Sequence, residues 1–106
     1  MEMNYTVENR DLTIHMVGEL DHHAARRAMK SIAEWIEQNL PSKTTLDFSG
    51  LTFMDSSGIA IVIRAKRRMD ALGGKLMVAN IPRQAARVLE TAGLDQYFSC
   101  ASGGEV

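Results

Sequence analysis

The sequence is poor in cysteine and has no long apolar run, and each scarcity excludes a class of protein. Its one cysteine, Cys100, leaves no intramolecular disulfide and no zinc site built from several cysteines. We therefore expect a reducing compartment, the cytoplasm. No run approaches the roughly 20 apolar residues that span a bilayer, and no basic start precedes an apolar segment. The sequence predicts neither secretion nor a membrane partner.

An excess of one charge is also missing. Twelve basic and thirteen acidic residues give a net charge of -1, whereas nucleic-acid-binding domains usually carry a basic excess on one face. We expect no direct contact with nucleic acid. The one clear basic cluster comprises Arg64, Lys66, Arg67 and Arg68.

The length and composition are those of an ordinary globular protein. With 106 residues, 45% hydrophobic and 24% charged, the chain is long enough for one core and too short for two. We predict a single domain over residues 1–106, with a core of about 4–100 and a tail at 101–106 that lacks any pattern.

Hydrophobic periodicity predicts strands and helices in alternation. A period of two over 5–18 indicates a hairpin, and Asp21 is a suitable N-cap for the first helix. The apolar run at 75–79 is typical of a buried central strand, and the run at 51–54 suggests a crossing segment. The predicted order is strand 5–8, strand 12–18, helix 23–39, strand 44–48, helix 57–72, strand 75–79, helix 82–92 and a short strand 97–100.

This order predicts an α/β fold in which helices pack against a largely parallel sheet. Functional groups in such sheets gather in loops at the carboxyl ends of the strands. Two loops qualify, at residues 18–23 and 51–58. The second contains Asp55, Ser56 and Ser57 at a predicted helix start, where unpaired N–H groups and the helix dipole stabilise a hydroxyl or an anion.

The motifs of the two loops, taken together, resemble the STAS domain, and most closely the bacterial anti-sigma factor antagonists. The resemblance covers about residues 4–100. It rests on Gly18-Glu19-Leu20-Asp21, Asp55-Ser56-Ser57-Gly58 and Ala92-Gly93-Leu94. It implies a STAS-like fold with a mixed four- to five-stranded sheet and three or more helices.

The resemblance also implies a function. In this family the unphosphorylated antagonist binds an anti-sigma factor that is also a serine kinase, phosphorylation of the antagonist ends the complex, and a PP2C-type phosphatase restores it. The phosphorylated serine corresponds to Ser57, with Ser56 beside it, and Asp21 corresponds to an aspartate near that serine. Neither a cofactor nor enzymatic activity is implied.

Local chemistry agrees with these roles. A phosphate on Ser57 would meet the free N–H groups of a helix start, while Asp21 and Asp55 make the region acidic, so a further negative charge would repel a partner. We expect partner contacts at Asp21, Asp55, Ser56 and Ser57. Met54 is either core or an adaptable contact, and Arg64 is either a solvated residue or a contact for an acidic partner.

Other functions receive less support. A serine hydrolase would need a Gly-x-Ser-x-Gly elbow and a separate aspartate to orient its histidine, yet Asp21 and His22 are adjacent. A nucleotide-binding loop is missing. His22 and His23 do not share a helix face, so no metal site is expected. A STAS scaffold that is never phosphorylated stays open.

The sequence departs from the family pattern in two places. Ala60 stands where members often have a second glycine after Gly58-Ile59, which changes how closely a partner approaches the helix start. Many members also continue into another helix beyond the position of Cys100.

Overall fold

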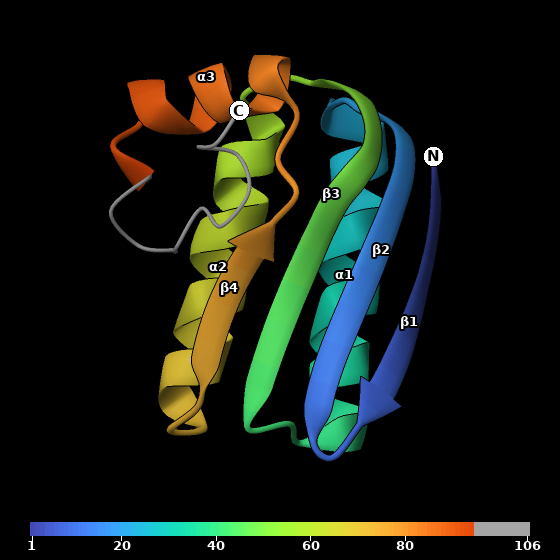
Figure 1. Ribbon diagram of the computed structural model, residues 1–106, viewed down its shortest axis with the longest axis vertical. Helices are drawn as coiled ribbons and strands as arrows, with labels where there is room; N and C mark the ends of the chain where they lie inside the picture. The colour runs from blue at the N-terminus through green and yellow to red at the C-terminus, as the bar shows by residue number, and fades with distance from the viewer. Residues whose placement is uncertain (95–106) are drawn as a thin grey trace.

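The fold alternates strands and helices in the predicted order (Figure 1). The computed structural model describes residues 1–94. The predicted strand at 97–100 and the tail at 101–106 lie outside the described residues. The elements are β1 Glu2–Glu8, β2 Asp11–Leu20, α1 His22–Asn39, β3 Lys43–Met54, α2 Ser57–Ala71, β4 Lys75–Ala79 and α3 Arg83–Thr91.

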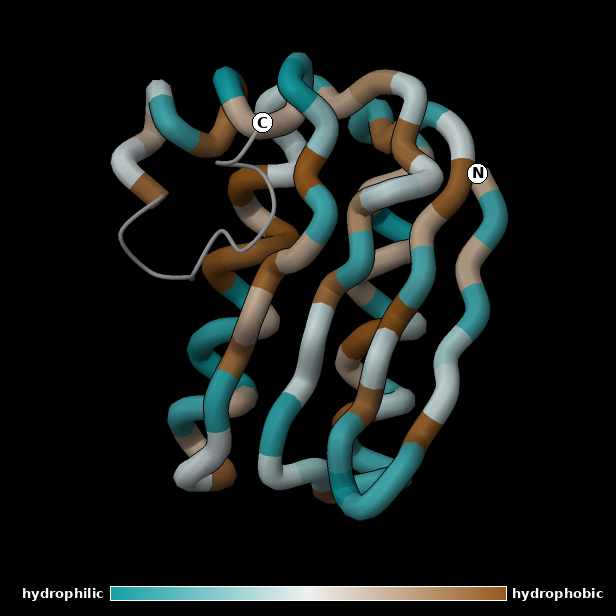
Figure 2. The backbone as a smooth tube through the Cα atoms, in the orientation of Figure 1, coloured by the Kyte–Doolittle hydropathy of each residue, from teal (hydrophilic) through white to brown (hydrophobic). Residues whose placement is uncertain are grey.

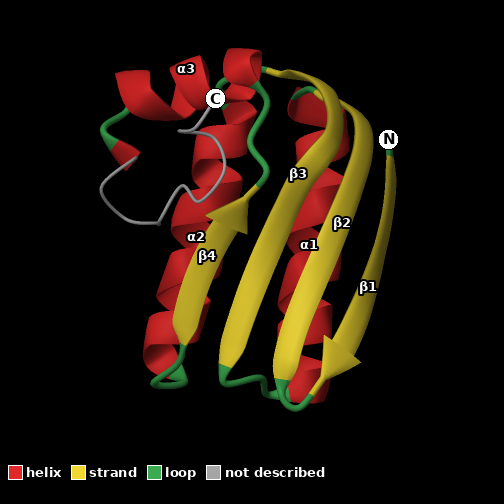
Figure 3. Cartoon of the chain, in the orientation of Figure 1, coloured by secondary structure: helices red, strands yellow, loops and turns green. Residues whose placement is uncertain are grey.

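The four strands form one mixed sheet in the order β1-β2-β3-β4. β1 and β2 are the predicted antiparallel hairpin, whereas β2 with β3 and β3 with β4 are parallel. Figure 3 shows α1 and α2 against one face of the sheet and α3 beside its upper end. The predicted α/β, STAS-like class, with a mixed four-stranded sheet and three helices, is confirmed for residues 1–94.

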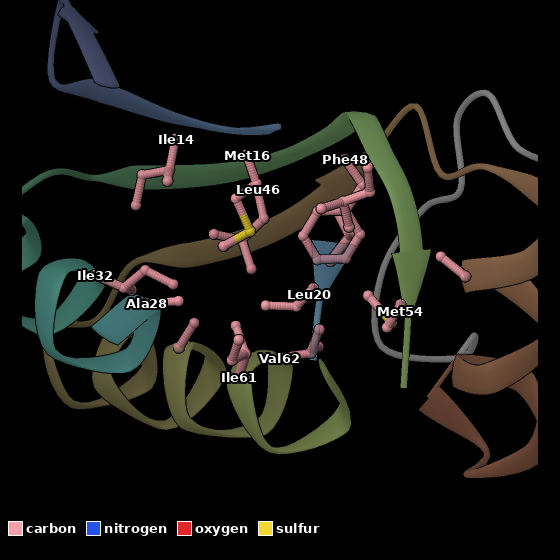
Figure 4. Close-up of a cluster of buried hydrophobic side chains, with 14 of the residues drawn as sticks. Ile14, Met16, Leu20, Ala28, Ile32, Leu46, Phe48, Met54, Ile61 and Val62 are labelled. Carbon is pink, nitrogen blue, oxygen red and sulfur yellow. The ribbon is translucent and has the colours of Figure 1, made fainter. Parts of the chain in front are cut away.

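The core lies between the sheet and its two covering helices. Side chains alternate along β2, so Leu12, Ile14 and Met16 are fully buried while Thr13 and His15 are not. The hydropathy colours alternate along the same strands in Figure 2. Figure 4 shows β2 and β3 side chains meeting those of the helices, with the labelled residues Ile14, Met16, Leu20, Ala28, Ile32, Leu46, Phe48, Met54, Ile61 and Val62.

One predicted boundary was wrong, because residues 51–54 continue β3 and do not form a separate crossing segment. Gly50 lets the strand continue, since a Cβ there would lie 2.8 Å from the Met16 carbonyl oxygen of β2. β2 stays paired with β3 over this length through shifts of register around Val17 and Gly18. Gly18 has a φ of 112° there. The long strand carries the chain from the core to the start of α2.

The strand predicted at 75–79 is β4, which pairs with β3 alone within residues 1–94. The second neighbour expected of a central strand is not among the described residues. Leu76 and Val78 face the helices, while Lys75 is exposed. A short apolar run shows that a strand is buried on at least one face, but its place in the sheet depends on the crossover of α2.

The helix ends follow local chemistry. Asp21 is the N-cap of α1, as predicted. Pro82 is the N-cap residue of α3 and not a residue of its first turn, and Gly93 follows that helix with a φ of 74°. Leu94 then packs into the core, 4% exposed. Across residues 1–94, none of the helices combines the length and apolarity needed to cross a membrane.

A polar cluster around Asp47 lies on the sheet face opposite α1 and α2. The Asp47 carboxylate is 3.1 Å from His15 Nδ1 and accepts hydrogen bonds from the Ser49 N–H at 3.0 Å and from Asn80 Nδ2 at 3.2 Å. Burial alone raises the pKa of Asp47, but the hydrogen bonds from Ser49 and Asn80 and the nearby His15 outweigh it and lower that pKa. The ionised carboxylate therefore stabilises the fold.

We expect Asp47→Asn to be less stable than the wild type at pH 7 by about 1 kcal/mol, because hydrogen bonds to a charged acceptor are replaced by weaker ones. Because the pKa of Asp47 is lower in the folded state, the wild type has this advantage above pH ~4, the pKa of the carboxyl in the unfolded chain. The advantage disappears as the pH falls through the pKa of the carboxyl in the folded protein. Urea unfolding between pH 7 and pH 2.5 measures it. The control is Asp70→Asn, which removes an exposed ion pair with Lys66 and should change little. A stability difference for Asp47→Asn that is independent of pH would contradict the assignment.

Candidate functional site

The two predicted loops meet at the carboxyl ends of β2 and β3. Leu20 and Met54 are paired in the register of the two strands, and the Asp55 N–H donates to the Leu20 carbonyl at 3.2 Å. Asp21 and Asp55 therefore follow directly from paired residues and begin the turns into α1 and α2. We call residues 20–22 and 54–58 the strand-end corner.

Asp21 acts as a cap on α1. Its backbone is extended, and Oδ1 accepts a hydrogen bond of 2.9 Å from the Ala24 N–H. That hydrogen bond is the main cause that lowers the pKa of the Asp21 carboxyl; desolvation opposes it, and the nearby His23 and His22 lower it further. Asp21 thus brings a negative charge to the strand-end corner at neutral pH.

Ser57 is the first residue of α2, and Asp55 holds its backbone. Asp55 Oδ1 accepts from the Ser57 N–H at 2.8 Å, whereas Ser56, the N-cap by position, makes no capping bond with its side chain. Ser56 is exposed and Ser57 is half-buried. The predicted Asp-Ser-Ser motif is therefore a turn in which the acid, and not the first serine, caps the helix.

The expectation that free N–H groups await a phosphate at this helix start was wrong. The Ser57 N–H is taken by the Asp55 carboxylate, the Gly58 N–H donates to the Asp55 carbonyl at 3.1 Å, and the Ile59 N–H donates to the Ser56 carbonyl at 3.1 Å. An anion on Ser57 would have to displace the Asp55 carboxylate or lie next to it. The strand-end corner is electrostatically less accommodating to an anion than an uncapped helix start.

Met54 is the buried residue beneath the strand-end corner. Its side chain is 0% exposed, so the alternative that placed it in contact with a partner is wrong for this conformation. A Cβ on Gly58 would lie 2.5 Å from Met54 Sδ. The missing side chain at Gly58 therefore lets the first turn of α2 close over the buried methionine, which ties the helix start to the core.

Phe53 belongs to the predicted loop at 51–58 but was given no role of its own, and Gln84 was not found from the sequence. Phe53, next to Met54 and three residues before Ser56 in the chain, is 42% exposed and offers an apolar surface. Gln84 on α3 exchanges two hydrogen bonds of 2.8 Å with the backbone of Met54. The single sequence gave no signal for Gln84, since a polar residue on a short helix is ordinary.

Arg64 is not brought to the strand-end corner. It lies two turns along α2, about 10 Å beyond Ser57 along the helix axis. With Arg68 it lines a groove of about 580 Å³ between α1 and α2, shared with Arg26 and Lys30 and with two glutamates. Lys66 instead pairs with Asp70 at 2.7 Å.

Two histidines, His22 and His23, follow Asp21 at the start of α1. The rings of His22 and His23 stack with centroids 4.5 Å apart, and both residues are exposed. Between residues 1 and 94, no group of three metal-ligating side chains gathers. The strand-end corner offers two serine hydroxyls and two carboxylates, and the exposed Phe53 directly precedes it on β3, a set of groups that suits recognition by another protein.

Comparison with known proteins identifies the fold family. A model of the STAS domain matches residues 2–103. The anti-sigma F factor antagonist of Lysinibacillus sphaericus is 30% identical over 96 residues, which are 91% of this chain and 82% of the relative. The antagonist of Paenibacillus polymyxa is 29% identical over 83 residues, 78% of this chain and 71% of the relative.

Solved structures agree. The anti-sigma factor antagonist SpoIIAA in its unphosphorylated form superposes with a TM-score of 0.83 at 28% identity, covering 98% of this chain and 91% of that one. The phosphorylated form of the Bacillus cell fate determinant SpoIIAA gives a TM-score of 0.74 at 28% identity, covering 98% and 95%. The chain belongs to the STAS domain family, and its similarity within that family is to the anti-sigma factor antagonists.

Proposed function

We propose that this protein is an anti-sigma factor antagonist of the SpoIIAA type that works by phosphorylation-controlled partner switching. Unphosphorylated, it binds an anti-sigma factor that is also a serine kinase and thereby frees the sigma factor. Phosphorylation of Ser57 ends that complex, and a PP2C-type phosphatase restores the binding form. The protein is the acceptor in this cycle and not an enzyme, and it acts in the cytoplasm.

The observation that carries the proposal is the position of Ser57 at the strand-end corner. The serine begins α2 and lies beside the capping carboxylate of Asp55, and the adjoining loop adds Asp21. Relatives named as anti-sigma factor antagonists support the partner, and the phosphorylated form of SpoIIAA supports the modification. Ser56 and Phe53, which lie within four residues of Ser57 in the chain, are exposed and available to a partner.

The occupied N–H groups favour a switch that acts on the partner. A phosphate adds about -1.5 to -2 charges, and it enters a corner where the Asp55 carboxylate already holds the Ser57 N–H. Because the helix start offers little compensation, the added charge repels an acidic or apolar partner surface across the interface. The core beneath it stays packed.

Mass spectrometry tests the modification directly. The protein is incubated with the cognate anti-sigma factor kinase and ATP, and phosphate is located in the wild type, Ser56→Ala and Ser57→Ala. We expect one phosphate on the wild type and on Ser56→Ala, and none on Ser57→Ala. Phosphate that persists in Ser57→Ala but is lost in Ser56→Ala would show that the phosphorylated residue is Ser56 and not Ser57. Binding without phosphorylation of any of the three proteins would favour a STAS scaffold.

A further inference from the structure

We propose that Gln84 is a positioning residue for the strand-end corner, one that holds the backbone of Met54 and so sets the geometry in which Ser57 is presented. This inference rests on the proposed function, because its consequence is read in partner binding and phosphorylation. The residue lies on α3, outside both sequence motifs. It acts through Met54 and Asp55 and does not itself need to touch the hydroxyl of Ser57.

Gln84 satisfies both backbone groups of Met54. Its Oε1 accepts from the Met54 N–H and its Nε2 donates to the Met54 carbonyl, each at 2.8 Å. A carboxamide is the side-chain group that offers a donor and an acceptor side by side, in the way that a peptide group does. Gln84 therefore pairs with β3 as one residue of a neighbouring strand would.

The pairing is needed because β4 is shorter than β3. The last residue of β4, Ala79, pairs with Asp47, and β3 continues for seven residues to Met54. On the opposite side β2 pairs with β3 as far as Met54. β4 does not extend far enough to pair with the Met54 N–H and carbonyl, so without Gln84 these two groups would have no partner on that side of β3. An unpaired backbone group costs stability when water is excluded.

Three linked contacts carry this restraint from α3 to Ser57. Gln84 holds the peptide groups on both sides of the Met54 Cα, the Asp55 N–H is held by the Leu20 carbonyl at 3.2 Å, and Asp55 Oδ1 holds the Ser57 N–H at 2.8 Å. Rotation of the backbone at Met54 would turn Asp55 and release the cap on α2. A loop held in its binding conformation loses less entropy when a partner binds.

The location of Gln84 makes this role separable from folding. The residue is exposed, and α3 is anchored to the core independently by Ala85 and Leu89, each 1% exposed. Replacing Gln84 by alanine leaves no cavity in the core and keeps a good helix former. A change in the strand-end corner can therefore be distinguished from unfolding.

Amide hydrogen exchange measured by NMR tests the contact itself, without any partner. In Gln84→Ala we expect the Met54 amide to exchange about 5- to 10-fold faster, because the hydrogen bond that it donates to Gln84 Oε1 is lost. Amides of β2 and of the middle of β3 should not change. The matched control is Gln38→Ala, which truncates an exposed glutamine at the C-terminal end of α1, the end opposite to the strand-end corner. An unchanged Met54 amide in Gln84→Ala would overturn the proposal.

Gln84→Glu supplies a signature that a merely structural residue would not give. At pH 7 the ionised carboxylate accepts from the Met54 N–H but has no proton for the Met54 carbonyl, which it repels. As the pH falls below about 4.3 the acid becomes protonated and regains a donor. We expect the protection factor of the Met54 amide to rise toward the wild-type value over that range, while Gln84→Ala shows no such recovery. A flat profile for Gln84→Glu would count against the paired geometry.

Binding and phosphorylation connect the contact to the switch. With the cognate anti-sigma factor kinase, Gln84→Ala should bind about 3- to 10-fold more weakly than the wild type and should be phosphorylated correspondingly more slowly at subsaturating kinase, whereas Gln38→Ala should match the wild type. Faster Met54 exchange with unchanged binding would overturn the positioning role. If the wild type itself neither binds nor is phosphorylated, the proposed function fails, and the positioning role with it; the exchange data still decide whether Gln84 holds Met54.

Discussion

Phosphorylation of Ser57 should weaken binding to the anti-sigma factor about 100-fold, which corresponds to about 2.8 kcal/mol. One uncompensated charge at an interface is sufficient for a loss of this size. The strand-end corner leaves the charge uncompensated, since the first N–H groups of α2 already have acceptors and Asp55 lies beside the serine. Asp21, ionised as the cap of α1, adds to the same negative region.

Isothermal titration calorimetry of the phosphorylated protein, Ser57→Asp and Ser57→Asn measures this effect. Ser57→Asn is the matched control, because it has nearly the shape of aspartate without its charge. We expect the order of affinity to be wild type, then Ser57→Asn, then Ser57→Asp, with the phosphorylated protein weakest. Ser57→Asp should fall short of the phosphorylated protein, since it carries less charge. Equal affinities for Ser57→Asn and Ser57→Asp would mean that shape, and not charge, controls the complex.

Replacing Phe48 by alanine should cost about 3–5 kcal/mol of unfolding free energy. Phe48 is 0% exposed and lies in β3 among Met16, Leu20 and Met54 in the labelled core of Figure 4. Truncation removes a buried ring and leaves a cavity that the rigid sheet cannot close. A loss of this size is a large part of the stability of a domain of about 100 residues.

Phe53→Ala is the matched control on the same strand. Phe53 is 42% exposed, so its truncation should cost about 1 kcal/mol or less in urea unfolding. Under the proposed function it should instead weaken binding to the anti-sigma factor, because the ring is an exposed apolar surface at the end of β3, four residues before Ser57 in the chain. Similar losses of stability for Phe48→Ala and Phe53→Ala would show that β3 is not buried as described.

The added charge of a phosphate and the restraint from Gln84 act at the same place for different reasons. Asp55 already accepts from the Ser57 N–H, so a phosphate would compete for that donor, and in our proposal Gln84 holds the backbone that precedes Asp55. Under the proposed function, a strand-end corner that is acidic and held in place would convert one modification into a loss of affinity. A more mobile loop would rearrange around the phosphate and weaken the response.

Much of this protein was determined by local sequence. Alternation in β2 and three- and four-residue spacing in α1 predicted those elements, because one face of each must be apolar to reach the core. Asp21 predicted a helix start, which its hydrogen bond to Ala24 confirmed. The meeting of the two acidic loops followed from topology, since the ends of adjacent parallel strands share one edge of the sheet. The roles of Ser57 and its neighbours in binding stay predictions.

Only the tertiary structure decided how the strand-end corner is held together. The length of β3 depends on the close approach of β2 at Gly50, and the place of β4 next to β3 depends on which strand it pairs with. The burial of Met54 and the hydrogen bonds of Gln84 depend on contacts between residues that are far apart in the sequence. Periodicity reports which face of one element is apolar; the partner that each backbone and side-chain group finds is set by the packing of several elements at once.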